Sequence, residues 1–383
     1  MISVLINELD VMGGTQKQVL RFCEYLQAEG EEFELVTKYL NLEKTYPEFS
    51  KFNIKKISKS KRKMNNILRV FYDLYLQLKI YSLISKKYTV LNVHDNGFPL
   101  VILLAGMFNK KVYWQINDLP GAFLVGNAKD SKRSFLRDAF NTLSRILYKK
   151  LIIKVIDQIT VNVTKNKERV NLFFDKGAEV LYCGVDIWKG SPPRKLGYRK
   201  KIKILSSGVF FPYRNYETQV ALIKKMLENG YEVELNIIGS TALNTQYSEK
   251  ILNLIKQENL SEFIHIHGQV SQKEYIKLHE ESDLFVFINI DQSWGLAVFE
   301  AMSAGLPVIV SNSVGATEIL DNGNNAIFVN PTCVSEIFSN IQKLENPEIY
   351  QKVSMSALNY VNNLSWDNTY SKKLLVMIKK DSK

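Results

Sequence analysis

The chain contains 383 residues, of which 46% are hydrophobic and 23% are charged, and its formal net charge is +11. This length exceeds what one hydrophobic core usually organises, so we expect two domains with ample apolar residues for their cores. Three widely spaced cysteines, Cys23, Cys183 and Cys333, argue against a disulfide framework or a zinc ribbon and favour a reducing cytoplasm. No apolar stretch approaches the ~20 residues that span a bilayer, and the first residues lack the features of a signal peptide.

The positive charge is concentrated in the first half of the chain. Residues 1–185 contain 29 Lys and Arg against 18 Asp and Glu, whereas residues 186–383 contain 21 basic and 21 acidic residues. The densest basic segments, 55–69 and 129–154, are interleaved with apolar residues at spacings of three and four, which is typical of amphipathic helices. Two interpretations remain open: the apolar faces pack on the domain, or one basic helix lies on an anionic membrane surface. Nucleic acid is disfavoured, because no recognised binding motif is present.

In chain order, the first half alternates short apolar strands with helices. Such an alternation predicts a parallel sheet, with functional loops at the C-terminal ends of its strands. The chain opens with a strand, a glycine turn and a helix over 16–29, as a Rossmann-like domain does. The expected strands cover residues 1–7, 32–37, 89–93, 111–115 and 159–163.

Polar and glycine residues follow three of these strands and are candidate functional residues. Gly13 and Gly14 do not form a G-x-G-x-x-G pattern, which disfavours a nicotinamide dehydrogenase. His94 follows another strand, and Asn117 and Asp118 follow the next one. Structural alternatives stay open for each of them: a plain tight turn, a loop histidine, and an aspartate that only turns the chain.

A segment over 188–201 with two prolines and a glycine predicts an interdomain linker. Further strands are expected in the second half. His265 and His267 alternate with isoleucines and therefore indicate a strand more than a metal site. No metal-binding pattern of Asp-x-Asp or Cys/His type is present. The expected strands cover residues 202–206, 233–239, 263–268, 284–288 and 308–310.

The most informative segment, 291–311, joins a polar glycine turn, a short helix and a buried strand. Capping and turn residues from Asp291 to Gly295 open the helix. The helix N-terminus presents unpaired N–H groups and the positive end of the helix dipole, which suit a phosphate. Glu300, about a turn and a half inside the helix, can accept two hydrogen bonds from a diol such as a ribose. The alternative is an ordinary helix–strand joint with an exposed glutamate.

This segment resembles the nucleotide-sugar signature of the retaining glycosyltransferases called family 4, or group 1. That signature is a Glu, seven residues and a second Glu, followed by Ala-Met-x-x-Gly-x-Pro-Val. Glu300 matches the second acid, which in the family holds the ribose, and Gln292 stands at the first, which in the family lies by the donor sugar. An amide at this position still hydrogen-bonds to a sugar hydroxyl but places no negative charge near an oxocarbenium.

Other segments match the same family in part. In the loop over 207–215, the usual Arg falls on Val209 and Arg214 stands at the usual Lys position, so the resemblance makes Arg214 the cation for the diphosphate. Gln269 and Val270 lie in the segment that resembles the family's base-binding turn. The resemblance places the glycine turn, His94, Asn117 and Asp118 on the acceptor side.

The resemblance implies an α/β protein with the GT-B fold, in which two Rossmann-like, doubly wound domains face an interdomain cleft. Its expected parts are an acceptor domain over 1–187, the linker over 188–201, a nucleotide-sugar domain over 202–364, and a C-terminal helix over 365–383 that crosses back to the first domain.

The implied activity is retaining sugar transfer from a nucleoside-diphosphate sugar, a UDP-sugar rather than GDP-mannose, without a metal or cofactor. The implied acceptor is a saccharide or lipid-linked oligosaccharide of bacterial surface polysaccharide or lipopolysaccharide synthesis, handled in the cytoplasm, at the inner face of the membrane. Two alternatives stay open, a non-catalytic nucleotide-sugar-binding homologue and another GT-B activity such as a nucleotide-sugar epimerase. The candidate catalytic residues are Arg214, Gln292, His94 and Asp118; the donor-binding ones are Gly208, Arg214, Gln269, Val270, Gln292, Ser293, Trp294, Gly295, Leu296 and Glu300; the acceptor-side ones are Gly13, Gly14, His94, Asn117 and Asp118.

Overall fold

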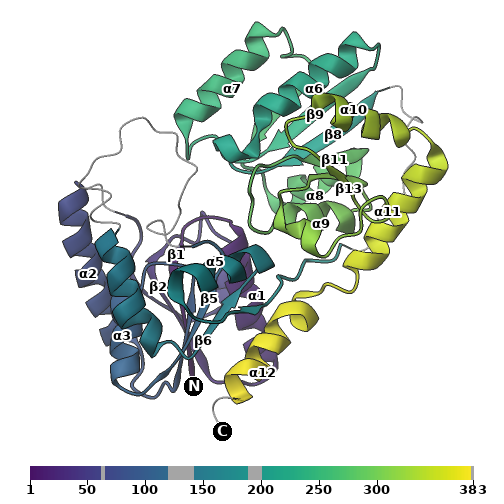
Figure 1. The fold of residues 1–383 in the computed structure, drawn as a ribbon. Helices are drawn as coiled ribbons and strands as arrows, with labels where there is room; N and C mark the ends of the chain where they lie inside the picture. The colour runs from purple at the N-terminus through teal and green to yellow at the C-terminus, as the bar shows by residue number, and fades with distance from the viewer. Residues whose placement is uncertain (62–64, 120–141, 189–200, 381–383) are drawn as a thin grey trace. The chain divides into compact units, whose positions relative to one another are not determined.

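A computed structural model describes residues 1–61, 65–119, 142–188 and 201–380, except for the side chains at positions 66 and 67. Most of the expected linker and the basic segment over 129–141 therefore lie outside the described residues. The chain divides into two compact units, shown in Figure 1: unit 1 is Met1–Gly184 with Trp366–Lys383, and unit 2 is Val185–Ser365.

Unit 1 is built on a seven-stranded sheet in the order β3-β2-β1-β4-β5-β6-β7, in which every neighbouring pair is parallel. The order reverses between β1 and β4, which makes this a doubly wound sheet. Its strands are β1 (Ile2–Leu9), β2 (Phe33–Leu40), β3 (Ile54–Ser58), β4 (Val90–His94), β5 (Lys111–Ile116), β6 (Gln158–Val161) and β7 (Glu179–Val180).

Helices cover both faces of this sheet. Neighbouring residues of a strand point to opposite sides, so each strand contacts helices on both faces. Trp114 of β5 packs against Phe174 of α5, whereas the Tyr113 hydroxyl donates to the Met377 carbonyl of α12. On the second face, Phe22 of α1 contacts Tyr370. The helical elements are α1 (Gly14–Ala28), η1 (Pro47–Lys51), α2 (Asn66–Leu83), α3 (Pro99–Met107), a helix over 142–147, η3 (Tyr148–Ile152), η4 (Ile153–Val155), α5 (Thr164–Phe174), η7 (Asp367–Ser371) and α12 (Lys372–Lys380).

Unit 2 contains a six-stranded parallel sheet in the order β10-β9-β8-β11-β12-β13. Its strands are β8 (Ile202–Ser207), β9 (Val233–Ile238), β10 (Ile264–Gly268), β11 (Leu284–Phe287), β12 (Val308–Ser311) and β13 (Ile327–Val329). Its helical elements are η5 (Pro212–Arg214), α6 (Tyr216–Glu228), α7 (Thr245–Gln257), α8 (Gln272–Glu281), α9 (Leu296–Ser303), η6 (Gly315–Glu318), α10 (Val334–Lys343) and α11 (Pro347–Val361).

The α/β class with two parallel sheets is confirmed, and three edge strands were missed, namely β3, β7 and β13. The lysine-rich segment expected to flank a helix is β3, an edge strand with Ile54 and Ile57 on opposite faces, so it lacks the alternation of a half-buried strand. At the edge of the second sheet, β13 has only three residues. No helix among the described residues is long and apolar enough to cross a bilayer.

Candidate functional site

Three glycines follow adjacent strands of unit 2 and bring their backbones into close contact. Gly208, Gly239 and Gly268 come at the C-terminal ends of β8, β9 and β10. The Gly208 amide donates to the Ile238 carbonyl at 2.8 Å, and the Gly239 amide donates to the Gly268 carbonyl at 2.9 Å. A Cβ atom on Gly239 would lie 1.9 Å from the Gly208 carbonyl oxygen, so only glycine fits. Gly239 was not among the predicted site residues.

Arg214 lies directly over this glycine-rich edge. A Cβ atom on Gly208 would lie 2.6 Å from the Arg214 Cζ atom. The guanidinium carbon is also 5.1 Å from the ring centre of Tyr213 and 5.6 Å from that of Phe287. Its Nε atom is buried and has no hydrogen-bond partner in the part of the chain that the structure describes. A buried, charged donor without an acceptor is costly, and an anion that accepts from it would recover that cost.

The loop that carries Arg214 is held in place by the protein itself. Asn215, at a φ of 55°, donates from Nδ2 to the carbonyls of Ile288 at 3.2 Å and Pro331 at 2.7 Å. The Tyr216 hydroxyl donates to the Gly208 carbonyl at 2.7 Å. These bonds tie the loop to the ends of β8 and β11, so the guanidinium is positioned before any ligand arrives.

Helix α9 begins next to the same Phe287 ring. Gly295, with a φ of 98°, precedes the helix, and a Cβ atom there would lie 3.0 Å from both Phe287 Cε1 and Val314 Cγ1. Glycine is therefore required for conformation and for space. The Arg214 guanidinium and the start of α9 therefore both adjoin Phe287.

Glu300 is buried in α9, with 7% of its surface exposed, so the alternative of an exposed glutamate is wrong. Its Oε2 atom accepts a hydrogen bond of 2.8 Å from the hydroxyl of Tyr275 in α8. Tyr275 fixes the orientation of the carboxylate, and the sequence analysis missed it. The available signal was Ser271, which caps α8 by accepting from the Glu274 amide at 3.2 Å and thereby sets the phase of that helix.

The residues between β11 and α9 serve partly as packing. Gln292 accepts from Asn289 Nδ2 at its Oε1 atom, at 3.0 Å, and from the Gly315 amide at its carbonyl, also at 3.0 Å. Trp294 is buried and stacks on Phe299 with ring centres 4.9 Å apart. The remaining predicted donor residues are more open: Gln269 is exposed, and Val270, Ser293 and Leu296 are half-buried.

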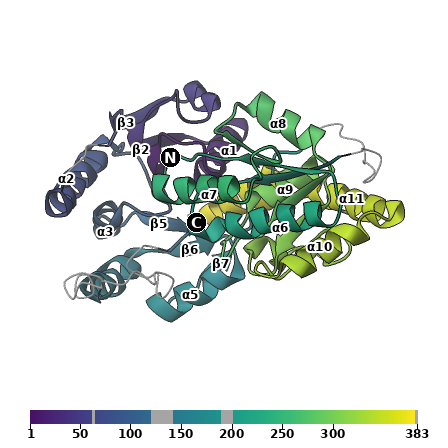
Figure 2. The same ribbon diagram turned by 90° about the horizontal axis from the view of Figure 1, so that it is seen from above.

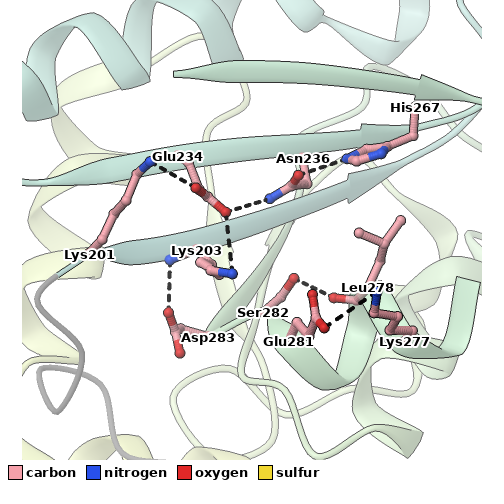
Figure 3. A network of polar contacts seen from close by, with 10 residues as sticks. All are labelled: Lys201, Lys203, Glu234, Asn236, His267, Lys277, Leu278, Glu281, Ser282 and Asp283. Atoms are coloured by element: carbon pink, nitrogen blue, oxygen red, sulfur yellow. Dashed lines mark hydrogen bonds and ion pairs between the residues drawn. The ribbon is translucent and has the colours of Figure 1, made fainter. Parts of the chain in front are cut away.

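A separate polar network covers part of the second sheet, as Figure 3 shows. Glu234 pairs with Lys201 at 2.8 Å and Lys203 at 3.7 Å and accepts from Asn236 at 3.2 Å. His267 is hydrogen-bonded to Asn236 Oδ1 at 2.7 Å. Within the described ranges, no group of three or more His, Cys, Asp or Glu residues is arranged to hold a metal ion.

In unit 1, a hydrogen-bonded network joins the ends of β1, β4 and β5, and its centre is Asp95. One Asp95 carboxylate oxygen accepts from the Thr15 hydroxyl at the start of α1, and the other accepts from the Asn117 amide at 2.7 Å. The Trp114 indole donates to the Asp95 carbonyl at 2.7 Å. Burial, with a smaller contribution from the charge of Asp118, raises the pKa of Asp95 to about 6. Neither Thr15 nor Asp95 was predicted as a site residue.

The predicted residues of unit 1 lie in and around this network. His94 is fully buried, is hydrogen-bonded to Asn92 Oδ1 at 2.8 Å, and has its pKa lowered to about 3 by burial, so its ring is neutral at physiological pH. Asn117 donates to Gln18 Oε1 at 2.8 Å. The remaining three lie at the rim: Gly13 and Gly14 begin α1, and the Asp118 carbonyl accepts from Asn96 at 3.3 Å.

Residues 192–357 match the family model described as Glycosyl transferases group 1. Over this segment the chain is similar to the group 1 glycosyltransferases. A probable sucrose-phosphate synthase of Thermosipho melanesiensis is 25% identical to it over 98% of this chain and 93% of that protein. An O-antigen chain mannosyltransferase of Salmonella typhimurium is 27% identical over 44% of this chain and 45% of that protein.

The likeness to solved structures shows that the chain has the GT-B fold. The crystal structure of Anabaena HepE in complex with UDP-glucose aligns with a TM-score of 0.74 at 12% identity, covering 99% of this chain and 100% of that one. The matched segment contains α9 and Glu300, and this match confirms the resemblance to group 1. The assignment to family 4 within the group remains a prediction.

Proposed function

We propose that the protein transfers a sugar, with retention of configuration, from a nucleoside-diphosphate sugar to a saccharide or lipid-linked acceptor. The observation that carries this proposal is the buried Arg214 Nε donor, which has no acceptor in the described part of the chain and lies over Gly208. A diphosphate supplies the missing acceptor, and a guanidinium binds two of its oxygens at once.

The other groups of unit 2 support the same ligand. The N-terminus of α9 adds N–H groups and a positive dipole end for the phosphates. Glu300, oriented by Tyr275, holds the ribose hydroxyls, and the turn at Gln269 and Val270 contacts the base. As the sugar bond breaks, Arg214 and the helix dipole stabilise the charge that builds up on the departing diphosphate.

In the proposed step the acceptor attacks from the side of the leaving group, which retains the configuration, and a departing diphosphate oxygen takes the acceptor proton. The amide of Gln292 donates to the donor sugar, since its Oε1 atom is already bonded to Asn289. No metal or cofactor has a part in this proposal. On the acceptor side we place the glycine turn, His94, Asn117 and Asp118, with the Asp95 network as their support.

We favour UDP over GDP as the donor nucleotide, and this preference rests on the solved UDP-glucose complex of Anabaena HepE. A bacterial surface polysaccharide or lipopolysaccharide acceptor is supported by the O-antigen mannosyltransferase relative. The setting that we propose is the cytoplasm, at the inner face of the membrane.

A thermal-shift panel with UDP, GDP, ADP, their sugar conjugates and NAD(H) tests the donor site. A ligand at about 100 times its Kd adds roughly 2.7 kcal/mol to the free energy of unfolding. We expect a shift with one nucleoside diphosphate that Glu300→Ala and Arg214→Gln both reduce strongly, while Lys250→Gln on the exposed side of α7 retains it. A shift with none of the nucleotides, or one that both site substitutions leave unchanged, would contradict the proposal.

One observation favours a second candidate function, a non-catalytic nucleotide-sugar-binding protein. The amide of Gln292 and the apolar Val209 stand where the family usually has a charged side chain. Donor binding without formation of a glycosylated product or a hydrolysed donor would support this alternative and overturn the enzyme.

A further inference from the structure

Helix α2 of unit 1 has two apolar faces, although a helix packed on a sheet needs only one. Leu76 and Ile80 are buried against the sheet. On the opposite side, Phe71 is 66% exposed and Leu78 is 53% exposed. Their neighbours at helical spacing complete a stripe, and the exposed large apolar residues of the helix are Leu68, Val70, Phe71, Leu74, Tyr75, Leu78 and Leu83. Contiguous exposed apolar surface of this kind marks a binding face.

The stripe continues onto neighbouring elements of the same layer. Tyr81 at the end of α2 stacks on Phe108, which follows α3, with ring centres 6.2 Å apart. At the next contact, a Cβ atom on Gly106 of α3 would lie 2.3 Å from Val155 of η4, so the two elements are in direct contact. Figures 1 and 2 show α2 and α3 side by side. Further large apolar side chains are exposed at the end of α3, in the helix over 142–147 and in η3, namely Met107, Phe108, Leu143, Ile146, Leu147 and Leu151. We call this surface the α2–α3–η3 face.

The charge on this face is almost entirely positive. Residues 66–83, 99–110 and 142–155 contain one acid, Asp73, which is bonded to Lys38 and Gln77. The same ranges contain seven cations: Arg69, Lys79, Lys110, Arg145, Lys149, Lys150 and Lys154. An open hollow of about 530 Å³ lies beside η3 and α5, and four lysines line it with a single acid, Asp175.

We infer that the α2–α3–η3 face binds an anionic lipid bilayer, with the apolar stripe in the headgroup boundary and the lysines on the lipid phosphates. A helix with an apolar face and basic flanks lies in the interfacial plane and is attracted by anionic lipids. Within the described chain no helix can span a membrane, so the helix would lie on the surface and not cross it. This inference rests on the proposed function, because membrane binding would bring the protein to a lipid-linked acceptor.

Two other occupants fit the charges less well. A second copy of the chain, paired through the same face by a two-fold axis, would bring two sets of seven cations together. A nucleic acid would contact the lysines but would leave the stripe around Phe71 and Leu78 uncovered.

Sedimentation of the full chain with vesicles tests the inference. We expect binding at low salt to vesicles that contain phosphatidylglycerol, and little binding to pure phosphatidylcholine. Phe71→Gln combined with Leu78→Gln should weaken partition at least tenfold, because it removes two exposed apolar groups. Replacing Lys149 and Lys154 with Gln should weaken it roughly fivefold per lysine.

The matched control lies on the other face of the sheet. Val376 of α12 is 57% exposed, and lysines flank it at positions 372, 373, 379 and 380. Val376→Gln should leave partition unchanged. In addition, tryptophan emission should shift to the blue on anionic vesicles for Phe71→Trp but not for Val376→Trp.

Three results would overturn the inference: no binding to anionic vesicles at low salt, equal losses in the stripe variant and the Val376 control, or self-association of the wild type that the stripe variant abolishes. The stripe variant should keep its nucleotide thermal shift, because the donor residues lie in unit 2. Failure of membrane binding is therefore distinguishable from failure of the proposed donor site.

Discussion

The two units are built on similar parallel sheets, yet their strand ends are prepared for different tasks. In unit 2, Gly295 and the Arg214 guanidinium both adjoin Phe287, the Arg214 Nε atom has no acceptor among the described residues, and Glu300 is buried nearby in the sequence, in α9. In unit 1, the corresponding edge is a closed network around Asp95, in which both carboxylate oxygens are already bonded. In the described part of the chain, the Arg214 Nε atom of the first edge therefore lacks an acceptor, whereas the Asp95 carboxylate of the second edge is internally satisfied. Two domains with the same architecture can therefore differ in chemistry through a few side chains at the strand ends.

The largest expected effect comes from the glycine contact in unit 2. Gly239→Ala places a Cβ atom 1.9 Å from a backbone oxygen, so we expect a loss of about 3 kcal/mol in the free energy of unfolding and loss of the nucleotide shift. The control is Gly14→Ala in unit 1, where a Cβ atom meets nothing within 4 Å and stability should change by less than about 1 kcal/mol. Urea unfolding measures both, and equal losses would remove the distinction between the two edges.

A second prediction concerns the closed network of unit 1. Burial raises the pKa of Asp95 from 3.8 to about 6, so the folded state holds its proton more tightly than the unfolded state. Stability from this group is present below pH 4 and is lost as the pH rises to 6, by up to about 3 kcal/mol at 1.4 kcal/mol per pKa unit. Asp95→Asn should therefore be more stable than wild type at pH 7.5, with the difference vanishing near pH 4. Wild type and variant share the opposite contribution of buried His94, so it cancels. A difference independent of pH would refute the assignment.

Arg214→Gln tests whether the guanidinium of unit 2 binds a ligand or only supports the structure. Removal of a charged hydrogen-bond donor should weaken nucleoside-diphosphate binding by about 2 kcal/mol, which is roughly thirtyfold. The same change should leave the stability of the free protein equal or raise it, because it removes a buried donor without a partner. Calorimetric titration and thermal unfolding without ligand separate the two effects. Lower stability with unchanged affinity would show that Arg214 is a structural residue.

The smallest predicted effect is that of Tyr275→Phe, which removes one hydrogen bond to Glu300 and should weaken donor binding by about 1 kcal/mol. Tyr231→Phe is the matched control, since its hydroxyl also donates to a glutamate, Glu345, but at an exposed site. We expect no change in donor affinity for the control. If both substitutions weaken binding equally, Tyr275 does not act through Glu300.

The sequence predicted much of unit 2 because its signals are local. The segment around Glu300 combines a turn, a helix start and a buried strand within about twenty residues, and each signal depends on near neighbours. The edge strand β3 was missed, because its lysine-rich sequence lacks the alternation of a half-buried strand. Tyr275 was missed because its role depends on a contact 25 residues away in the chain.

Composition and periodicity alone determined two parallel sheets, an uneven charge and the glycine turns at strand ends, since these depend on backbone conformation and short-range patterns. Only the tertiary structure decided which polar groups are satisfied. It buried His94 beside Asn92, bonded both oxygens of the Asp95 carboxylate, left Arg214 Nε without an acceptor among the residues that the structure describes, and exposed the second apolar face of α2. These outcomes depend on which residues, far apart in the sequence, come into contact in the folded chain. The local sequence pattern does not specify those contacts.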